Sequence, residues 1–225
     1  MMKTLVYWAL FLCVALSAQA TVARILYYNP QQTAPSSIYM YVENQLLGEV
    51  NAALDFGDDL DLDTSGEAIE IVFSPTQIAE GATLASGLPT VTVNQDWEKC
   101  LIVVVEAAGN ERLPVEAYAV NADTHFFGES DFLFINRSPN RLLGTFGETQ
   151  IEVGAEDLHV VRMAQHRGEF LDVKIDYIRP DDDDKRRWMI QQGWRVLPDR
   201  RTVLICYAPA GRTSMKYFAV QIKDL

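Results

Sequence analysis

A run of carboxylates is the first group in this sequence whose spacing matches a known chemistry. Five acidic residues occupy positions one, three, five, nine and twelve of an EF-hand-like loop, which binds calcium through oxygen ligands: Asp59, Asp61, Asp63, Glu67 and Glu70. The sixth position needs glycine for a sharp turn, and Thr64 stands there. Leu60 and Leu62 alternate with the aspartates, which favours a regular strand with a solvated acidic face. Calcium binding is the alternative to that interpretation.

Two tryptophans near the C-terminus are the second candidate site. Trp188 and Trp194 are six residues apart with Gly193 between them, so on one continuous strand they would share a face. Arg187 and Arg195 lie beside them as polar partners. An exposed pair of this kind would stack on sugar rings, whereas packing in a core or a domain interface is the commoner fate of tryptophan. The pair therefore predicts a ligand-binding surface only if both rings are exposed.

The sequence contains no motif that indicates catalysis. It lacks the G-x-S-x-G pattern of a nucleophile elbow and the Gly-Lys-Ser/Thr ending of a phosphate loop. The histidines His125, His159 and His166 do not make the short paired spacing of a zinc site. We therefore expect no cofactor apart from the calcium alternative, and no enzyme activity. A hydrolase whose motif cannot be recognised is the remaining enzymatic alternative.

The two cysteines outside the N-terminal segment are candidates for core packing or for a disulfide. Cys100 and Cys206 both lie in apolar runs that resemble strands, and they are the cysteines that follow residue 20. Two buried free thiols are the simpler interpretation. A disulfide between Cys100 and Cys206 is the alternative, because export would place the chain in an oxidising compartment.

The first twenty residues have the pattern of a signal peptide. Lys3 precedes an apolar run from Leu5 to Leu16, and the segment ends in Ala18-Gln19-Ala20. We expect cleavage near Ala20 and export to the periplasm or the exterior, with no transmembrane segment in the mature chain. The formal net charge of −12 disfavours nucleic acid, because phosphate binding needs a clustered basic face. A protein or a glycan at the cell exterior is the expected partner.

The clearest local structure lies between Asp131 and Gly154. Asp131 to Asn136 is aromatic and β-branched and stops before Pro139, which cannot donate to a sheet. Leu142 to Phe146 and Thr149 to Val153 then flank Gly147-Glu148, which places glycine first, as a type II′ hairpin turn requires. This stretch predicts three short strands joined by two turns.

Similar short strands fill the chain, and no long segment keeps the 3.6-residue apolar period of a helix. The pattern predicts an all-β protein of two tandem antiparallel β-sandwich modules of the immunoglobulin-like kind. The stretch Ala107 to Pro114 is small, polar and broken by Gly109, so the modules are expected at residues 21–108 and 113–225. Ile25 to Pro30 and Phe132 to Pro139 both pass from an aromatic strand to Asn and Pro, which hints at duplicated modules.

Residues 115–225 carry a resemblance to a known group. The segments F-L-F-I-N-R-S-P and R-R-T-V-L-I-C-Y, the glycine-turn hairpin, and the final K-Y-F-A-V-Q-I-K-D are similar to those of uncharacterised exported bacterial proteins built from two β-sandwich modules. The resemblance implies the fold and export, and it brings no catalytic residues. We therefore expect an acidic, non-enzymatic structural or binding component, with a carbohydrate-binding or adhesive module as the alternative.

Overall fold

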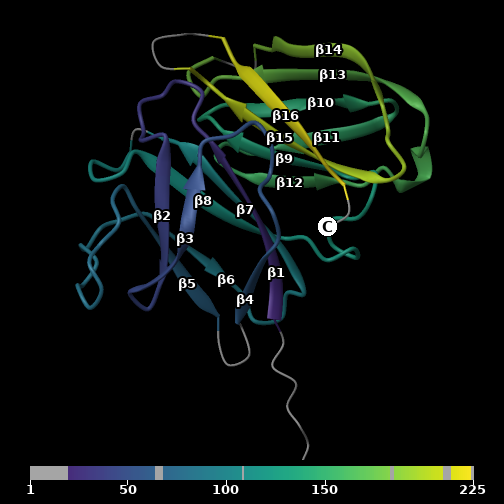
Figure 1. The fold of residues 1–225 in the computed structure, drawn as a ribbon. Helices are drawn as coiled ribbons and strands as arrows, with labels where there is room; N and C mark the ends of the chain where they lie inside the picture. The colour runs from purple at the N-terminus through teal and green to yellow at the C-terminus, as the bar shows by residue number, and fades with distance from the viewer. Residues whose placement is uncertain (1–19, 64–67, 108, 183–184, 210–213, 224–225) are drawn as a thin grey trace, which may run out of the picture.

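A computed structural model describes residues 20–63, 68–107, 109–182, 185–209 and 214–223. These residues form β-strands, with a single 3₁₀ turn (η1, Ala164–His166) among the part of the chain so described (Figure 1). The expected signal peptide lies almost wholly outside the described residues, and the first strand begins at Ala20. The all-β sandwich class predicted from the strand pattern is confirmed.

The first eight strands make two four-stranded sheets, with the orders β4-β1-β7-β8 and β3-β2-β5-β6. Their bounds are β1 Ala20–Tyr28, β2 Ser37–Val42, β3 Gln45–Asn51, β4 Leu60–Asp63, β5 Ile69–Ser74, β6 Thr90–Val93, β7 Lys99–Glu106 and β8 Val115–Asn121. The two sheets enclose a core that includes Tyr27, Ile71, Phe73 and Ile102.

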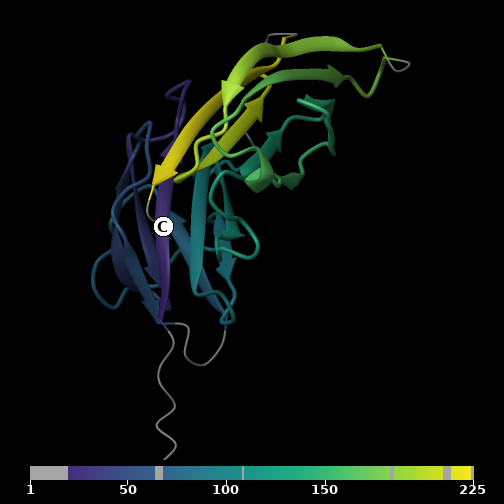
Figure 2. The same ribbon diagram turned by 90° about the vertical axis from the view of Figure 1, so that its right-hand side faces the viewer.

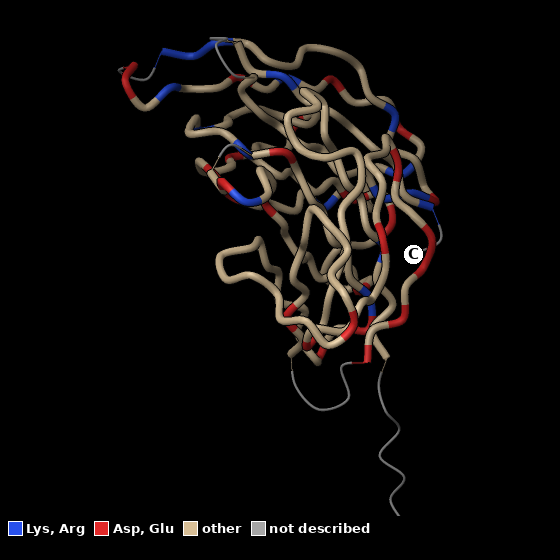
Figure 3. The backbone as a smooth tube through the Cα atoms, turned by 60° about the vertical axis from the view of Figure 1, so that its left-hand side comes forward, with Lys and Arg blue, Asp and Glu red and all other residues tan. Residues whose placement is uncertain are grey.

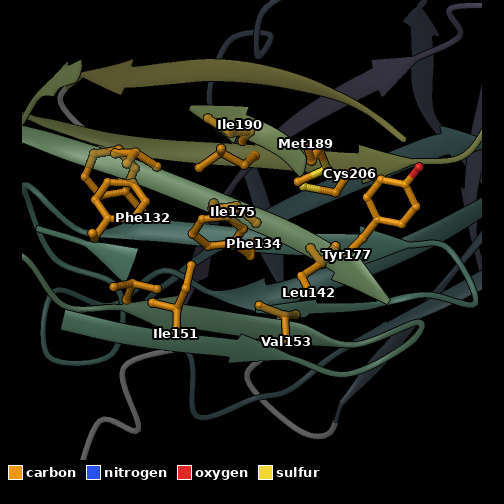
Figure 4. Close-up of a cluster of buried hydrophobic side chains, with 14 of the residues drawn as sticks. Phe132, Phe134, Leu142, Ile151, Val153, Ile175, Tyr177, Met189, Ile190 and Cys206 are labelled. Atoms are coloured by element: carbon orange, nitrogen blue, oxygen red, sulfur yellow. The ribbon is translucent and has the colours of Figure 1, made fainter. Parts of the chain in front are cut away.

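The last eight strands make a second sandwich, with the sheet orders β12-β9-β15-β16 and β11-β10-β13-β14. Their bounds are β9 Phe132–Arg137, β10 Arg141–Phe146, β11 Thr149–Val153, β12 Leu158–Val161, β13 Phe170–Ile178, β14 Arg187–Arg195, β15 Arg200–Tyr207 and β16 Lys216–Lys223. Figure 4 shows the core between these sheets, where Phe134, Ile175 and Leu142 point toward one another. At the predicted hairpin turn Gly147 has a φ of 55° and Glu148 has no positive φ, as a type II′ turn requires.

The two sandwiches repeat one topology strand for strand. Each strand from β1 to β8 has its counterpart eight strands later, in the same sheet position. Both sandwiches also contain one parallel pair, β1 with β7 and β9 with β15, and Leu26 faces Val103 as Leu133 faces Val203. The similarity between Ile25–Pro30 and Phe132–Pro139 therefore reflects structurally equivalent strands.

The sheet pairing corrects the predicted position of the module boundary. The sequence pattern assigned Val115 to Asn121 to the second module, after a break at Ala107 to Pro114. In the structure that segment is β8, which pairs with β7 along its whole length. The polar break is the hairpin loop between these two strands, and the connection between the sandwiches is residues 122–131.

The two sandwiches share a third core. One sheet of each sandwich packs against the other sandwich with the face that is turned away from its own core. These are the sheets β4-β1-β7-β8 and β12-β9-β15-β16, so the molecule has four layers (Figures 1 and 2). Leu26, Val103, Leu133, Val203 and Ile205 are all buried in this shared core. Strands that are buried on both faces need apolar residues at successive positions. This explains the continuous runs Leu101 to Val105 and Val203 to Cys206, which do not alternate.

The connection at residues 122–131 is fastened by a buried arginine from the second sandwich. The guanidinium of Arg201, which is 4% exposed, donates to the carbonyl oxygen of Ala122 and lies 5.8 Å from the centre of the Phe127 ring. Burial lowers the pKa of Arg201, and nearby Glu129, Asp131 and Asp123 oppose that shift. Arg24 adds a second link, since it pairs with Asp59 at 2.5 Å and donates to the Lys223 carbonyl oxygen at 2.7 Å. The two sandwiches are therefore joined by polar as well as apolar contacts.

Equivalent asparagines hold the loop that follows the first strand of each sandwich. Asn29 Nδ2 donates to the Ala34 carbonyl oxygen at 2.9 Å. Asn136 Nδ2 donates to the carbonyl oxygens of Asn140 and Gly154 at 2.7 and 2.6 Å, and Asn136 Oδ1 accepts from Ser138. Asn136 is 1% exposed, so water cannot replace these bonds.

Replacing Asn136 by alanine should lower the free energy of unfolding by about 2 kcal/mol, because buried carbonyl groups lose their donors. Asn29→Ala should cost about 1 kcal/mol, since its bonds are only part-buried. Urea denaturation of both variants measures the difference. Equal losses in the two variants would contradict this assignment of the Asn136 bonds.

Candidate functional site

A β-bulge in β14 separates the two tryptophans that the sequence placed on one face. Ile190 pairs with Ile175 and Trp188 pairs with Asp176, so Met189 is an extra residue between them. Met189 and Ile190 are both buried, which turns Trp188 to the outer face. Trp188 is 76% exposed, whereas Trp194 is half-buried and packs against the core of the second sandwich. The expectation of a shared aromatic face is therefore wrong.

Trp194 instead lines a cleft at the edge of the second sandwich, between the edge strands β14 and β16. The cleft has a volume of about 400 Å³. Side chains from four strands and one loop line it, among them Phe132, Gln192, Trp194, Arg195, Tyr217 and Gln221. This volume lies within the range of small-molecule sites.

The Trp194 ring is held in place by other aromatic rings. Its centroid lies 5.9 Å from that of Phe132 in a stacked arrangement and 5.5 Å from that of Phe146 in an edge-to-face arrangement. Tyr217 lies across the cleft with its ring centroid 6.0 Å from that of Trp194. Fixed rings of this kind present a rigid apolar surface at low entropic cost.

The polar groups of the cleft include hydrogen-bond donors that are free to bind a ligand. Gln192 Nε2 donates to the Tyr217 hydroxyl oxygen at 2.8 Å, so the Tyr217 proton can be donated elsewhere. Arg195 lines the same cleft, and no Asp, Glu or His is among the lining residues that the structure describes. The arrangement can bind a ligand that has an apolar face and hydrogen-bond acceptors. Among the lining residues that the structure describes, none is a carboxylate or an imidazole that could act as a general base.

The corresponding edge of the first sandwich is closed. There β6 comes into close contact with β8. The inner face of β8 carries the small residues Ala117 and Ala119, which pack against the core and allow that approach. The strand register identifies the residue of β8 that is equivalent to Tyr217 of β16. It is Val115, which pairs with Glu106 as Tyr217 pairs with Cys206. The large rings of Trp194 and Tyr217 thus keep the second sandwich open where the first one closes.

The two remaining residues of the predicted aromatic surface lie outside the cleft. Trp188 is on the outer face of β14, next to the loop after β13. Arg187 pairs with Asp182 across that loop, and this bond lowers the pKa of Asp182 and raises that of Arg187. Of the four predicted residues, the structure therefore brings Trp194 and Arg195 together and leaves Trp188 and Arg187 apart from them.

The acidic run forms the strand that its leucines indicated. Leu62 is buried in β4, while Asp61 and Asp63 are exposed and Asp59 pairs with Arg24. Glu70 lies on β5 in the other sheet, and Glu67 lies outside the described residues. Within the ranges that the structure describes, no three His, Cys, Asp or Glu residues gather closely enough to hold a metal ion. Calcium binding by this run therefore remains an untested alternative.

The two cysteines lie in different cores and do not pair. Cys100 is buried between the sheets of the first sandwich and Cys206 between those of the second, and both are free. Burial raises the pKa of each thiol to about 12, with a smaller contribution from Asp123 at Cys100. The interpretation as buried free thiols fits the structure, and the disulfide alternative does not.

Convergent ionisable groups, which a hydrolase would need, line two cavities. Glu43, Asp63 and Glu70 border one of about 750 Å³ in the first sandwich, with carboxylates alone as its ionisable groups among the described residues. The other is a smaller cavity of about 240 Å³ at the junction of the two sandwiches. Both of its carboxylates are engaged in structural bonds. Glu106 accepts from the backbone nitrogens of Gln31 and Thr33 at 2.7 and 3.2 Å. Glu116 pairs with Arg137 and accepts from the Tyr118 hydroxyl at 2.7 Å. This cavity therefore gives little support to hydrolysis.

Charge is distributed unevenly between the two halves. Residues 20–121 contain fifteen Asp and Glu against three Lys and Arg, whereas residues 122–225 contain sixteen against fifteen. Figure 3 shows that the Lys and Arg positions gather on the second sandwich. The residues that line the cleft therefore all belong to the half whose charges nearly balance.

Comparisons with known proteins identify no family. No protein-family model matches the chain, and the search of curated proteins found no match. A solved structure titled "The Bacillus anthracis TIE protein" is similar over 79% of this chain, at 11% identity and a TM-score of 0.22. This chain spans about a third of that structure, 31% of its length. A similarity at this TM-score supports no conclusion on fold or function. Among the described residues, no helix has the length and hydrophobicity needed to span a membrane.

Proposed function

We propose that this protein is an exported, non-enzymatic binding component of the periplasm or the cell exterior. The Trp194 cleft supports this proposal most directly, because fixed aromatic rings and hydrogen-bond donors meet there, and its described lining includes no Asp, Glu or His. A protein or a glycan is the expected partner. A purely structural role would leave the cleft without a ligand.

Carbohydrate binding is the specific form of this function that the cleft favours. Sugar rings have an apolar face that stacks on aromatic side chains, and their hydroxyl groups accept hydrogen bonds. The separation of Trp188 from Trp194 leaves Trp194, Tyr217 and Phe132 as the aromatic residues of the cleft. This geometry suits one short segment of a glycan better than a long flat surface.

A glycan array followed by calorimetry tests the proposal. We expect binding that Tyr217→Phe weakens about tenfold, because the variant loses the hydroxyl that Gln192 holds. Trp194→Phe should weaken binding by a similar factor while preserving most of the packing. Trp188→Ala is the matched control and should bind as the unaltered protein does. If Trp188→Ala abolishes binding and the cleft variants do not, the site is on the outer face of β14.

Export makes a separate prediction. A cell that expresses the full chain should release a protein whose first residue is Thr21, as mass spectrometry of the secreted or periplasmic fraction would show. Leu10→Arg interrupts the apolar run from Leu5 to Leu16 and should retain the full-length chain inside the cell. Recovery of the unaltered chain, still carrying residues 1–20, in the cytoplasm would contradict export.

A further inference from the structure

The geometry points to a sugar that carries a carboxylate, a hexuronic acid unit of a polysaccharide, as the ligand of the Trp194 cleft. This inference rests on the binding function proposed above and names its ligand class. Three features of the cleft carry it: the aromatic wall, the one charged lining residue, and the charges of the surrounding surface.

The aromatic wall fits a six-membered sugar ring. Trp194 and Tyr217 border a cleft of about 400 Å³, and their ring centroids are 6.0 Å apart at an interplanar angle of 48°. At this distance the two rings touch each other, so a pyranose would stack by its apolar face on the sides of the rings that border the cleft. This feature selects a sugar but not its charge.

Arg195 supplies the charge selectivity. It is the charged residue that lines the cleft, and it makes no ion pair with any residue that the structure describes. A guanidinium presents paired N–H donors that match the two oxygens of a carboxylate. With a neutral sugar the Arg195 guanidinium would bind only hydroxyl groups. With a carboxylate it could form two charge-assisted hydrogen bonds, so the acid should bind more tightly.

No Asp or Glu is present among the described residues that line the cleft, so none of them would repel an anion. The other polar groups facing the cleft are Gln192, Thr202, Tyr217 and Gln221, which are uncharged. Arg200 lies beside Gln221, with its Nη1 3.4 Å from Gln221 Oε1, and adds a second positive charge near the rim. An anionic polysaccharide would be repelled by the first sandwich, with fifteen acidic residues against three basic ones, and would approach the second.

The test compares short oligomers of galacturonic and glucuronic acid with their methyl esters, which keep the ring and remove the charge. Calorimetry of residues 21–225 should give at least tenfold tighter binding of the acids than of the esters at low ionic strength. The ratio should fall as salt is added. Arg195→Gln should reduce the ratio to about twofold without changing the affinity for the esters.

Arg141→Gln is the matched control, because it removes the same charge from an exposed arginine elsewhere on the second sandwich. It should keep the preference for the acids. Equal binding of acids and esters, lost in Tyr217→Phe, would overturn the charge preference and leave the sugar-binding function standing. A preference that survives Arg195→Gln would overturn the role of Arg195. If no uronic acid probe binds, the inference fails, and the glycan array then decides the proposed function by itself.

Discussion

Raising the pH from 9 to 12 should unfold this protein, because three buried groups must lose protons that the fold retains. Burial raises the pKa of Cys100 and Cys206 from the ordinary 9 to about 12. Burial, with a smaller contribution from Glu106, raises the pKa of Tyr27 from 10 to about 12. In the unfolded chain these groups ionise at their ordinary pKa, so the unfolded state binds fewer protons above pH 9 and becomes favoured as the pH rises.

The size of the effect follows from proton linkage. Each thiol should remove about 2 to 3 kcal/mol of stability by pH 11, since a shift of one pKa unit is worth about 1.4 kcal/mol. Below pH 9 the contribution is fully present and stability should not depend on these groups. Urea denaturation at intervals between pH 8 and 11 measures the slope.

The double variant Cys100→Ala, Cys206→Ala is the control for the alkaline effect. It should be somewhat less stable at pH 8, because each replacement leaves a small cavity in a packed core. Its stability should then fall less steeply with pH than that of the unaltered protein. The same slope in both proteins would show that other groups cause the alkaline loss.

Among the glycines that the structure describes, Gly144 should be the one whose replacement by alanine is most damaging. Gly144 lies in β10 opposite Ile175, and a Cβ placed there would lie 2.8 Å from the Ile175 Cα and in still closer contact with the Lys174 carbonyl oxygen. Both contacts are with the backbone of β13, which cannot turn aside as a side chain would. We expect a loss of about 3 kcal/mol or more in the free energy of unfolding, the upper range for overpacking.

Gly48→Ala provides the matched control, because Gly48 is also a strand glycine. Its added Cβ would meet only the end of the Met40 side chain, at 3.7 Å, which is ordinary van der Waals contact. We expect a change of less than about 1 kcal/mol in this variant. Thermal unfolding of both variants separates the two cases. Similar melting temperatures would mean that β10 and β13 move apart without cost.

The strands themselves could be predicted from the sequence, because local rules decide them. Thr149 to Val153 alternates and follows a glycine turn, and it forms β11 with those same bounds. Val173, Ile175 and Tyr177 share the buried face of β13, as their alternation predicts. Neighbouring residues determine these features, so no long-range information is needed.

Features that depend on distant partners could not be predicted in this way. The boundary was misplaced because Val115 to Asn121 reads as a strand whichever sheet it joins, and only its pairing with β7 decides the matter. The bulge at Met189 leaves no pattern in the sequence, although it reverses the direction of Trp188. Tyr217 and Gln192 were missed as cleft residues because β14 and β16 belong to different sheets. No local signal would have brought them together.

The shared core between the two sandwiches also affects how the chain can vary. Equivalent faces of two equivalent modules meet there, as they would in a homodimer of one module. In a homodimer every substitution occurs twice at the interface, once in each subunit. In this single chain the two halves can differ. Leu101 and Arg201 are equivalent by strand register, yet one is an apolar core residue and the other holds the connecting segment.

A symmetric pair of arginines at that position would bury a second positive charge in place of Leu101, at a cost of several kcal/mol. The covalent link thus permits an asymmetric interface in which one half supplies a cation and the other supplies a leucine. The same freedom extends to the outer edges, where one sandwich is closed and the other carries the cleft. Because the two modules are covalently joined, the second can carry a cleft while the first keeps a closed edge and contributes to the shared core.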